Sequence, residues 1–191
     1  MTASTQPVST QPVSTQSRQE PGTLQLVQFR ETESEDLPFV LAAERNPANS
    51  PYVTQWPLTR HQRAIEHPDE RHWIIEADDQ PVGYAILAGL NDPNEVLEFR
   101  RLVIIQKGKG YGRASIQWLK QFAFEQQQAH RLWLDVKTHN QRAQKLYRSE
   151  GFVKEGTLRE CIKTNSGYES LYIMALLAPA YQKAQPSGSG D

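Results

Sequence analysis

The chain has 191 residues, of which 38% are hydrophobic and 23% are charged, and its formal net charge is −1. These values are those of an ordinary globular protein, long enough for one domain with a sizeable core. No run of about 18 apolar residues exists, so a membrane-spanning helix is not expected. The single cysteine, Cys161, excludes an intrachain disulfide, and the sequence lacks the pattern of a signal peptide. We therefore expect a cytoplasmic protein with no membrane partner.

Charge is distributed unevenly along the chain. Residues 1–99 contain 6 Lys and Arg against 15 Asp and Glu, whereas residues 100–191 contain 15 against 7. Six basic residues and no acidic one lie between Arg100 and Phe124. This asymmetry indicates that the C-terminal half binds an anion, and chance segregation of surface charge is the alternative. Aromatic residues are not interleaved with the basic ones, so a nucleic-acid partner is not expected.

The composition predicts three segments. Residues 1–22 repeat the polar unit STQPV and cannot bury enough apolar surface to offset the entropy of ordering, so a disordered tail is expected there. Residues 23–180 contain the alternating helix and strand patterns of one domain. The polar, glycine-rich ending predicts a flexible C-terminus at residues 181–191.

The N-terminal half predicts two helices among four strands. Alternating apolar and polar residues indicate half-buried strands, and Ser34 and Thr59 are the candidate N-caps of the two helices. A short polar turn at 78–80 joins the second and third strands as a hairpin. The predicted elements are strands at 24–30, 71–77, 81–90 and 95–104, and helices at 32–45 and 59–67.

The C-terminal half predicts two more helices and three more strands. Trp118 and Phe122 lie on one apolar face of the first helix, and the second helix begins at an Asn140 cap and ends before Gly151. The predicted elements are helices at 111–123 and 140–150, and strands at 131–136, 153–162 and 168–177. The whole order predicts a mixed α/β sheet with one crossover helix.

The segment QKGKGYGRAS, residues 106–115, joins a predicted strand to a predicted helix. A phosphate-binding Walker loop needs a lysine after its second glycine, and the position that should hold that glycine is Arg113. A dinucleotide-binding fingerprint fails as well, because no third glycine follows at the required spacing. The remaining template is the acetyl-CoA loop, [QR]-x-x-G-x-[GA], which residues 107–112 fit except that Lys107 occupies the first position.

The chemistry of this loop suits a pyrophosphate. Backbone N–H groups at a helix N-terminus carry roughly half a positive charge and cradle anions. Glycines allow the backbone to approach phosphates without a Cβ in the way. Lys107, Lys109 and Arg113 add cationic contacts.

Two blocks of the sequence, QKGKGYGRAS and HNQRAQKLYRSEGF, together resemble the GNAT superfamily of N-acetyltransferases. The second block is similar to that family's N-x-x-A-x-x-L-Y-x-x-x-G-F signature. The resemblance covers residues 95–177 well and 24–94 loosely, and it is greatest to the branch of ribosomal-protein N-terminal and spermidine acetyltransferases. It implies a mixed, mostly antiparallel sheet of about seven strands with flanking helices, splayed between the fourth and fifth strands.

The resemblance also implies an activity and a co-substrate. It implies direct transfer of the acetyl group of acetyl-CoA to a primary amine, in a ternary complex without a covalent enzyme intermediate. A bulge is expected near Phe99–Leu102, with the pantetheine of acetyl-CoA along the strand that follows it. The cofactor-binding residues implied are Leu102, Val103, Ile104, Lys107, Gly108, Lys109, Gly110, Tyr111, Gly112, Arg113 and Asn140.

Two side chains are candidates for the chemistry. Tyr147 falls on the family's helix tyrosine, which donates a proton or hydrogen bond to the departing thiolate; the alternative is a core aromatic. Asn140 is either a cofactor contact or only a helix cap. Glu98 is the best candidate for a general base, because an alkyl ammonium with a pKa near 10 must lose a proton before it attacks. The alternatives are an ion pair of Glu98 with Arg100 or Arg101, and a base that is a chain of waters.

The remaining expectations concern partners. The five histidines show no metal-ligand spacing, so no metal is expected. Tyr52, Trp56 and Trp73 are candidates to line an acceptor pocket, with loop packing as the alternative, and Cys161 is expected in the core. The acceptor is a small-molecule amine or a protein N-terminus, and the resemblance allows a homodimer. A non-catalytic domain that binds or senses acyl-CoA is the alternative function.

Overall fold

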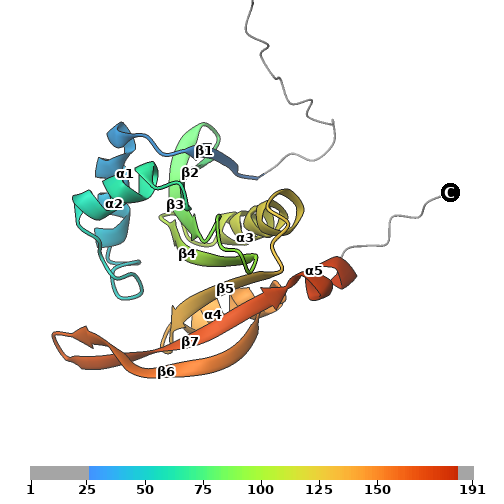
Figure 1. The fold of residues 1–191 in the computed structure, drawn as a ribbon. Coiled ribbons are helices and arrows are strands. Elements are labelled where there is room, and N and C mark those ends of the chain that lie inside the picture. The colour runs from blue at the N-terminus through green and yellow to red at the C-terminus, as the bar shows by residue number, and fades with distance from the viewer. Residues whose placement is uncertain (1–25, 185–191) are drawn as a thin grey trace, which may run out of the picture.

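The computed structural model describes residues 26–184, and Figure 1 shows their fold. The tail predicted at residues 1–22 lies outside the described residues. One mixed sheet of seven strands runs through the molecule in the order β1-β2-β3-β4-β5-β7-β6. All neighbouring strands are antiparallel except β4 and β5, which are parallel. The predicted sheet is therefore confirmed.

The seven strands alternate with the helices in the predicted order. The strands are β1 Gln28–Glu31, β2 Glu70–Ala77, β3 Gln80–Ala88, β4 Val96–Ile104, β5 Arg131–Lys137, β6 Val153–Thr164 and β7 Gly167–Leu177. The helices are η1 Ser34–Asp36, α1 Leu37–Arg45, α2 Leu58–Glu66, α3 Tyr111–Gln121, the π-helical turn η2 Phe122–Gln126, α4 Gln141–Ser149 and α5 Ala178–Ala184.

Helices cover both faces of the sheet, and each face has its own apolar core. On one face α1 packs Leu37 and Val40 against Tyr84 and Ile86 of β3. On the other face a larger core includes residues of α3 and is joined by side chains of α4. Figure 1 shows α1 and α2 on one side of β2 and β3, with α3 on the other side. A helix on each face buries the apolar residues of both sides of the central strands.

Helix boundaries differ from the prediction where caps were assigned from residue type alone. Ser34 begins the short helix η1, and Thr59 lies inside α2, whose N-cap position is Pro57. Asn140 does cap α4, because its side chain accepts a hydrogen bond from the Ala143 N–H. A serine or threonine near a helix start predicts a cap only when the chain turns there, and Pro57 sets the turn before α2.

Helix α5 lies where a flexible terminus was predicted from residue 181. Tyr181 is buried, stacks on Phe124 at 4.7 Å between ring centroids, and donates a hydrogen bond to Glu125 at 2.5 Å. These partners lie in the π-helical turn that follows α3, more than 50 residues earlier in the chain. The packing therefore orders a segment whose own composition carries little signal.

Candidate active site

Strand β4 contains one extra residue, a β-bulge, which reverses the faces of the sheet to which the following side chains of β4 point. The ladder between β3 and β4 leaves Arg100 without a partner on β3. Before this bulge Phe99 packs into the core beneath α3, and after it Val103 packs into the core beneath α1. The bulge expected near Phe99–Leu102 is confirmed, and it directs Arg101 toward α1 because one inserted residue reverses the alternation.

A cavity opens where β4 and β5 part. The two strands pair only from Val96 to Glu98, opposite Arg131 to Trp133, whereas β5 remains paired with β7 as far as Lys137. The cavity has a volume of about 870 Å³, and Leu102, Val103 and Ile104 contribute to its lining. Beyond Glu98, this edge of β4 has no strand partner among residues 26–184. Its backbone groups are therefore available to a ligand.

The glycine loop forms one end of the cavity. Gly108 and Gly110 have φ values of 83° and 85°, which glycine adopts without steric cost. Gly110 is the N-cap of α3, and no side chain of residues 26–184 caps this helix start. The first N–H groups of an α-helix have no carbonyl partner within the helix. The lining includes Gly108, Gly110, Tyr111, Gly112 and Arg113, as a pyrophosphate cradle requires.

The cations of this loop differ in what they contact. Lys107 lines the cavity and donates a hydrogen bond to Asn49 Oδ1 at 2.5 Å. Arg113 also lines the cavity, but its guanidinium is already paired with the carboxylate of Glu150. Lys109 is not among the lining residues. Phosphate contacts of all three side chains remain predictions, and that of Lys109 has the least geometric support.

Burial and a neighbouring cation act on Lys107. Partial burial lowers the pKa of Lys107 to about 8, and the positive charge of Arg142 lowers it in the same direction. Arg142 belongs to α4 and lines the same cavity. Two cations that repel one another beside the glycine loop form a site suited to an anion.

Glu98 and Asp135 both open into the cavity. Glu98 pairs with Trp133 across the parallel ladder, and Asp135 lies two residues beyond Trp133, on the same face of β5. Glu98 is bonded to Arg100, with oxygen–nitrogen distances of 2.9 and 2.5 Å. The predicted alternative, an ion pair of Glu98, is thus present, and it does not remove Glu98 from the cavity.

Asp135 has the surroundings of a proton acceptor. It is exposed through the cavity, yet enough protein surrounds its carboxyl for burial to raise the pKa of Asp135. The negative charge of Glu98 raises that pKa further. No ion pair joins Asp135 to another residue in the described part of the chain. A carboxylate with a raised pKa and a free face is suited to accept a proton.

Tyr147 reaches the cavity from α4. Its ring packs edge-on against Phe99 and Phe152, at centroid distances of 6.1 and 5.9 Å. Burial raises the pKa of Tyr147, and the charge of Asp135 raises it further, so the phenol stays protonated at neutral pH. The predicted core packing and the predicted access to the site are therefore both present. Asn140 likewise caps α4 and lines the cavity.

This geometry corresponds to one sequence family. The sequence profile of the acetyltransferase (GNAT) family matches residues 26–152. The chain belongs to the acetyltransferase (GNAT) family. It is accordingly an acetyl-CoA-dependent N-acetyltransferase, and the cavity at the β4–β5 splay is its candidate active site.

Relatives of this acetyltransferase include two bacterial enzymes. The spermidine N(1)-acetyltransferase of Escherichia coli (strain K12) is 24% identical over 163 residues, which cover 81% of this chain and 88% of the relative. The spermidine N(1)-acetyltransferase of Vibrio cholerae is 28% identical over 123 residues, which cover 63% and 71%.

Solved structures agree with the fold of this GNAT chain. Spermidine N-acetyltransferase from Vibrio cholerae in complex with CoA and spermine superposes with a TM-score of 0.74 at 25% identity, covering 82% of this chain and 98% of that one. A dodecameric structure of that enzyme has a TM-score of 0.71 at 23% identity, with coverage of 84% and 99%.

Some residues of this acetyltransferase site were not foreseen from the sequence. Asp135 and Asn49 were missed, although Asp135 is the one acidic residue of β5 and interrupts its apolar residues, which could have been noticed. Tyr52 and Trp56 do line the cavity, as was considered. Trp73 does not; it is buried in the core beneath α3. Contacts made by loops carry no periodic signal in a sequence.

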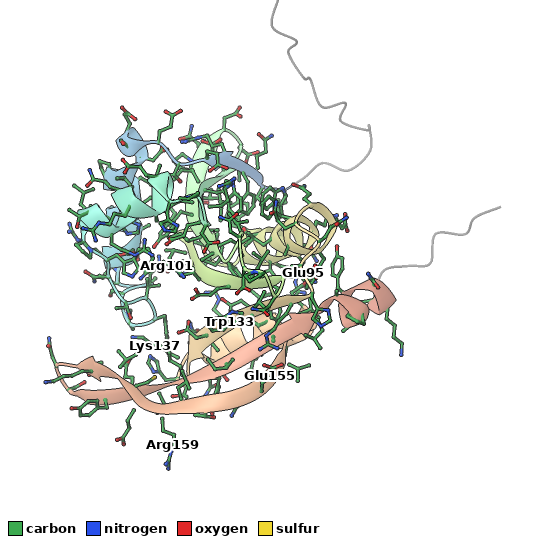
Figure 2. All side chains as sticks on the ribbon, in the orientation of Figure 1. Glu95, Arg101, Trp133, Lys137, Glu155 and Arg159 are labelled. Atoms are coloured by element: carbon green, nitrogen blue, oxygen red, sulfur yellow. The ribbon has the colours of Figure 1, made fainter. Side chains whose placement is uncertain are left out.

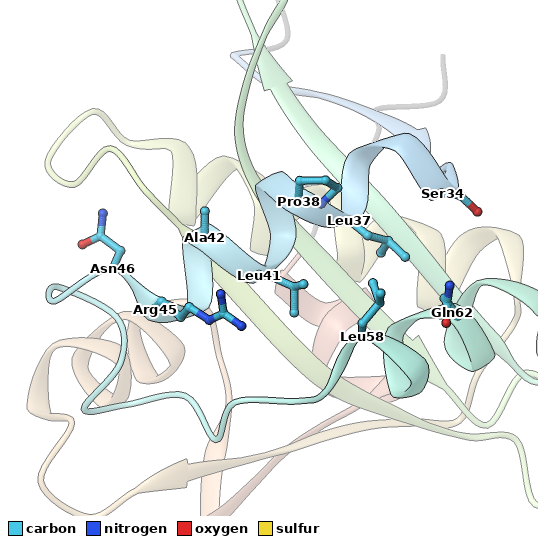
Figure 3. Close-up of a pocket in the computed structure, with 9 residues that line it drawn as sticks. All are labelled: Ser34, Leu37, Pro38, Leu41, Ala42, Arg45, Asn46, Leu58 and Gln62. Atoms are coloured by element: carbon cyan, nitrogen blue, oxygen red, sulfur yellow. The ribbon is translucent and has the colours of Figure 1, made fainter.

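A second cavity of the GNAT domain lies between α1 and α2 and has a volume of about 730 Å³. Figure 3 shows Leu41 and Leu58 facing each other across it, with Arg45 at one end. It shares no lining residue with the cavity at the splay. Within residues 26–184, no group of His, Cys, Asp and Glu side chains is placed to hold a metal ion, and no helix is long and apolar enough to cross a membrane.

Proposed function

We propose that the protein acetylates a primary amine of an aliphatic polyamine. The observation that carries the proposal is the pair of carboxylates, Glu98 and Asp135, which open into one cavity from neighbouring strands. An alkyl ammonium is attracted by such a pair, and a second ammonium on the same molecule adds a further ionic contact. The spermidine N-acetyltransferase relatives support this acceptor class.

The proposed binding of acetyl-CoA follows the splay. The pyrophosphate would lie on the N–H groups at the start of α3, next to Gly108 and Gly110. The pantetheine would lie along β4, where the backbone of residues 102–104 has no strand neighbour on the cavity side. One backbone N–H there would donate a hydrogen bond to the thioester oxygen and stabilise the negative charge that develops on it.

The proposed chemistry uses three side chains. Asp135, with Glu98 beside it, takes a proton from the ammonium directly or through water, which leaves the amine nitrogen a lone pair. That nitrogen attacks the thioester carbon, a C–N bond forms and the C–S bond breaks. The leaving sulfur takes a proton from Tyr147, which regains one as the amide nitrogen loses its excess proton. The net products are the N-acetyl amine, CoA and one proton.

A thiol-release assay tests the acceptor class. The purified full chain is incubated with acetyl-CoA and a panel that contains spermidine, spermine, a monoamine, amino acids and a peptide with a free N-terminus. We expect the highest kcat/KM with the polyamines. Transfer to the peptide but not to the polyamines would overturn the proposal, because the acceptor would then be a protein N-terminus. Binding of CoA without turnover of any amine would favour the non-catalytic alternative.

Location and assembly are further parts of the proposal. We place the enzyme in the cytoplasm, a compartment in which the lone cysteine stays reduced. We also propose that it self-associates, because β6 is an edge strand of 12 residues that leaves Val153 and Leu158 exposed. The dodecameric relative supports assembly in this family. Light scattering after size-exclusion chromatography would give the molar mass, and a monomer at micromolar concentration would contradict self-association.

A further inference from the structure

The segment between α1 and α2, residues 46–57, forms one wall of the active-site cavity, and we call it the acceptor loop. Cationic side chains from both halves of the sheet hold its backbone. Arg101 of β4 donates to the carbonyl of Thr54 at 2.6 Å, and Lys137 of β5 donates to that of Pro51 at 2.9 Å. Figure 2 labels both of these side chains, Arg101 on β4 and Lys137 on β5.

A third cation reaches the acceptor loop from the glycine loop. Lys107 donates to the side-chain oxygen of Asn49, which is only 3% exposed. Lys107 occupies the position where the family's loop has glutamine or arginine. Its bond is the one side-chain hydrogen bond that joins the glycine loop to the acceptor loop within the described residues.

Hydrogen bonds link Asn49 both to α1 and to the turn at residues 49–53, so a movement of Lys107 is transmitted through Asn49 to that turn. Its side-chain nitrogen donates to the Ala43 carbonyl at 2.9 Å, at the end of α1. Its own carbonyl accepts the N–H groups of Tyr52 and Val53, at 2.8 and 3.1 Å. A shift of Asn49 therefore moves the turn that carries Tyr52, a residue that lines the cavity.

The charge around Lys107 connects this bond to the pyrophosphate site. Arg142 of α4 repels the Lys107 ammonium. The acceptor loop presents Asn49, a neutral side chain, to Lys107. A pyrophosphate between these cations removes the repulsion and favours the charged ammonium. An ammonium has three donors, so it can bind a phosphate oxygen and Asn49 at the same time.

We infer that Lys107 is a positioning residue that transmits the binding of CoA from the glycine loop to the acceptor loop through Asn49. Bound pyrophosphate fixes the Lys107 ammonium, which fixes the turn at residues 49–53 and completes the acceptor wall. The inference rests on the proposed position of CoA. By thermodynamic reciprocity, an acceptor that orders this loop also tightens the binding of CoA.

Hydrogen–deuterium exchange of the full chain with saturating CoA tests this inference without any acceptor. In the wild type, CoA should slow exchange of the amides of Asn49, Ser50, Tyr52 and Val53 by about fivefold or more. Lys107→Met keeps the aliphatic stem but removes the donor, so at saturating CoA this protection should disappear. Lys107→Arg restores a charged donor and should restore the protection.

A neighbouring lysine supplies the matched control. Lys109→Met removes the same charge from the same loop, but Lys109 has no bond to the acceptor loop in the described structure. This variant should keep the protection of the acceptor loop at saturating CoA. Equal protection in the wild type and Lys107→Met would overturn the inference, as would a wild type whose residues 49–53 do not respond to CoA. Failure of CoA to bind at all would contradict the proposed function instead.

Discussion

Tyr147 combines two roles that are often treated as alternatives. Phe99 and Phe152 hold its ring edge-on, and this packing directs a protonated phenol toward the cavity. Tyr147→Phe keeps the packing and removes only the hydroxyl. We expect kcat to fall about 100-fold, because general acid catalysis contributes at least that much, while the KM for acetyl-CoA changes little. Steady-state kinetics with a thiol reagent measures both constants.

The control for this substitution is a tyrosine outside the site. Tyr168 is exposed on β7, and Tyr168→Phe should leave both constants unchanged. A Tyr147→Phe enzyme with the wild-type kcat would assign Tyr147 to packing alone.

Substitution of the two carboxylates should change the pH dependence of kcat in different ways. The active base is deprotonated, so kcat rises as pH increases through its pKa. The charge of Glu98 raises the pKa of Asp135. In Glu98→Gln the acid limb of the profile should therefore move to lower pH, whereas Asp135→Asn should lower kcat about 100-fold.

An exposed glutamate provides the reference for these profiles. Glu66 lies on the solvent face of α2, and Glu66→Gln should reproduce the wild-type profile. If Glu98→Gln loses activity at every pH and Asp135→Asn keeps it, Glu98 itself is the base.

The sequence predicted the site residues that belong to local motifs, but not those that depend on contacts between distant segments. Glycine spacing and the motif around Tyr147 identify a ligand loop and a helix because both are local patterns. The pKa of Asp135 depends on the charge of Glu98, and the position of the Lys107 ammonium depends on a hydrogen bond to Asn49, 58 residues away. Such pairings depend on the parting of two strands, which local sequence does not encode.

A buried polar cluster joins α1 to the sheet and to α2. Glu44 of α1 is 1% exposed and accepts hydrogen bonds from Tyr84 and Arg101, each at 2.5 Å. His61 Nε2 lies 3.3 Å from Glu44 without hydrogen-bond geometry, and the other ring nitrogen of His61 contacts His72 at 3.1 Å. Burial disfavours the charged carboxylate, but these neighbours outweigh it and lower the pKa of Glu44.

His72 makes this cluster sensitive to acid. Burial lowers the pKa of His72 to about 3, and the charges of His61 and Arg101 contribute in the same direction. The unfolded chain, with a histidine pKa near 6.5, binds the proton more readily than the folded one, so stability is complete above pH 6.5 and is lost as pH falls. We expect the free energy of unfolding to decrease by about 2 kcal/mol between pH 7 and pH 5.

Urea unfolding followed by tryptophan fluorescence at the two pH values measures this decrease. His72→Gln should be less stable at pH 7 and should lose most of the decrease. His130 is exposed, so His130→Gln should retain it. The same decrease in all three proteins would assign the acid sensitivity to other groups.

Helices and strands with a strong periodicity of apolar residues were predictable from the sequence. The exposure of side chains on the edge strand of the sheet was not. The alternation of β2 and β3 and the apolar face of α3 are properties of contiguous residues. Cys161 was expected in the core, yet it is exposed, because β6 is an edge strand whose register with β7 shifts between Leu158 and Ile162. An irregular edge strand has no second neighbour to cover its side chains.

At the scale of the whole molecule, the sheet consists of two parts that meet at three residue pairs between β4 and β5. A ligand that fills the splay binds both parts and should stabilise the fold. CoA at 100 times its Kd should add about 2.7 kcal/mol to the free energy of unfolding. For a domain of this size the midpoint of thermal unfolding should rise by about 5 to 10 °C.

Two glycine substitutions test that coupling. Gly110→Asp places a negative charge in the pyrophosphate site and should abolish the thermal shift. Gly156 lies in β6, and no atom of the described residues lies within 4 Å of an added Cβ, so Gly156→Asp should keep the shift. A normal shift in Gly110→Asp would contradict the position assigned to the pyrophosphate.

The left-handed backbone at Gly110 also restricts which amino acids this position tolerates. Asparagine and aspartate are the side chains that accept such a φ most readily, and aspartate would repel the phosphates. Among the described residues, an added Cβ meets only the flexible end of Leu26, at 3.2 Å. A library randomised at this codon and selected for acetylation should therefore return glycine first and asparagine second, with the β-branched residues absent.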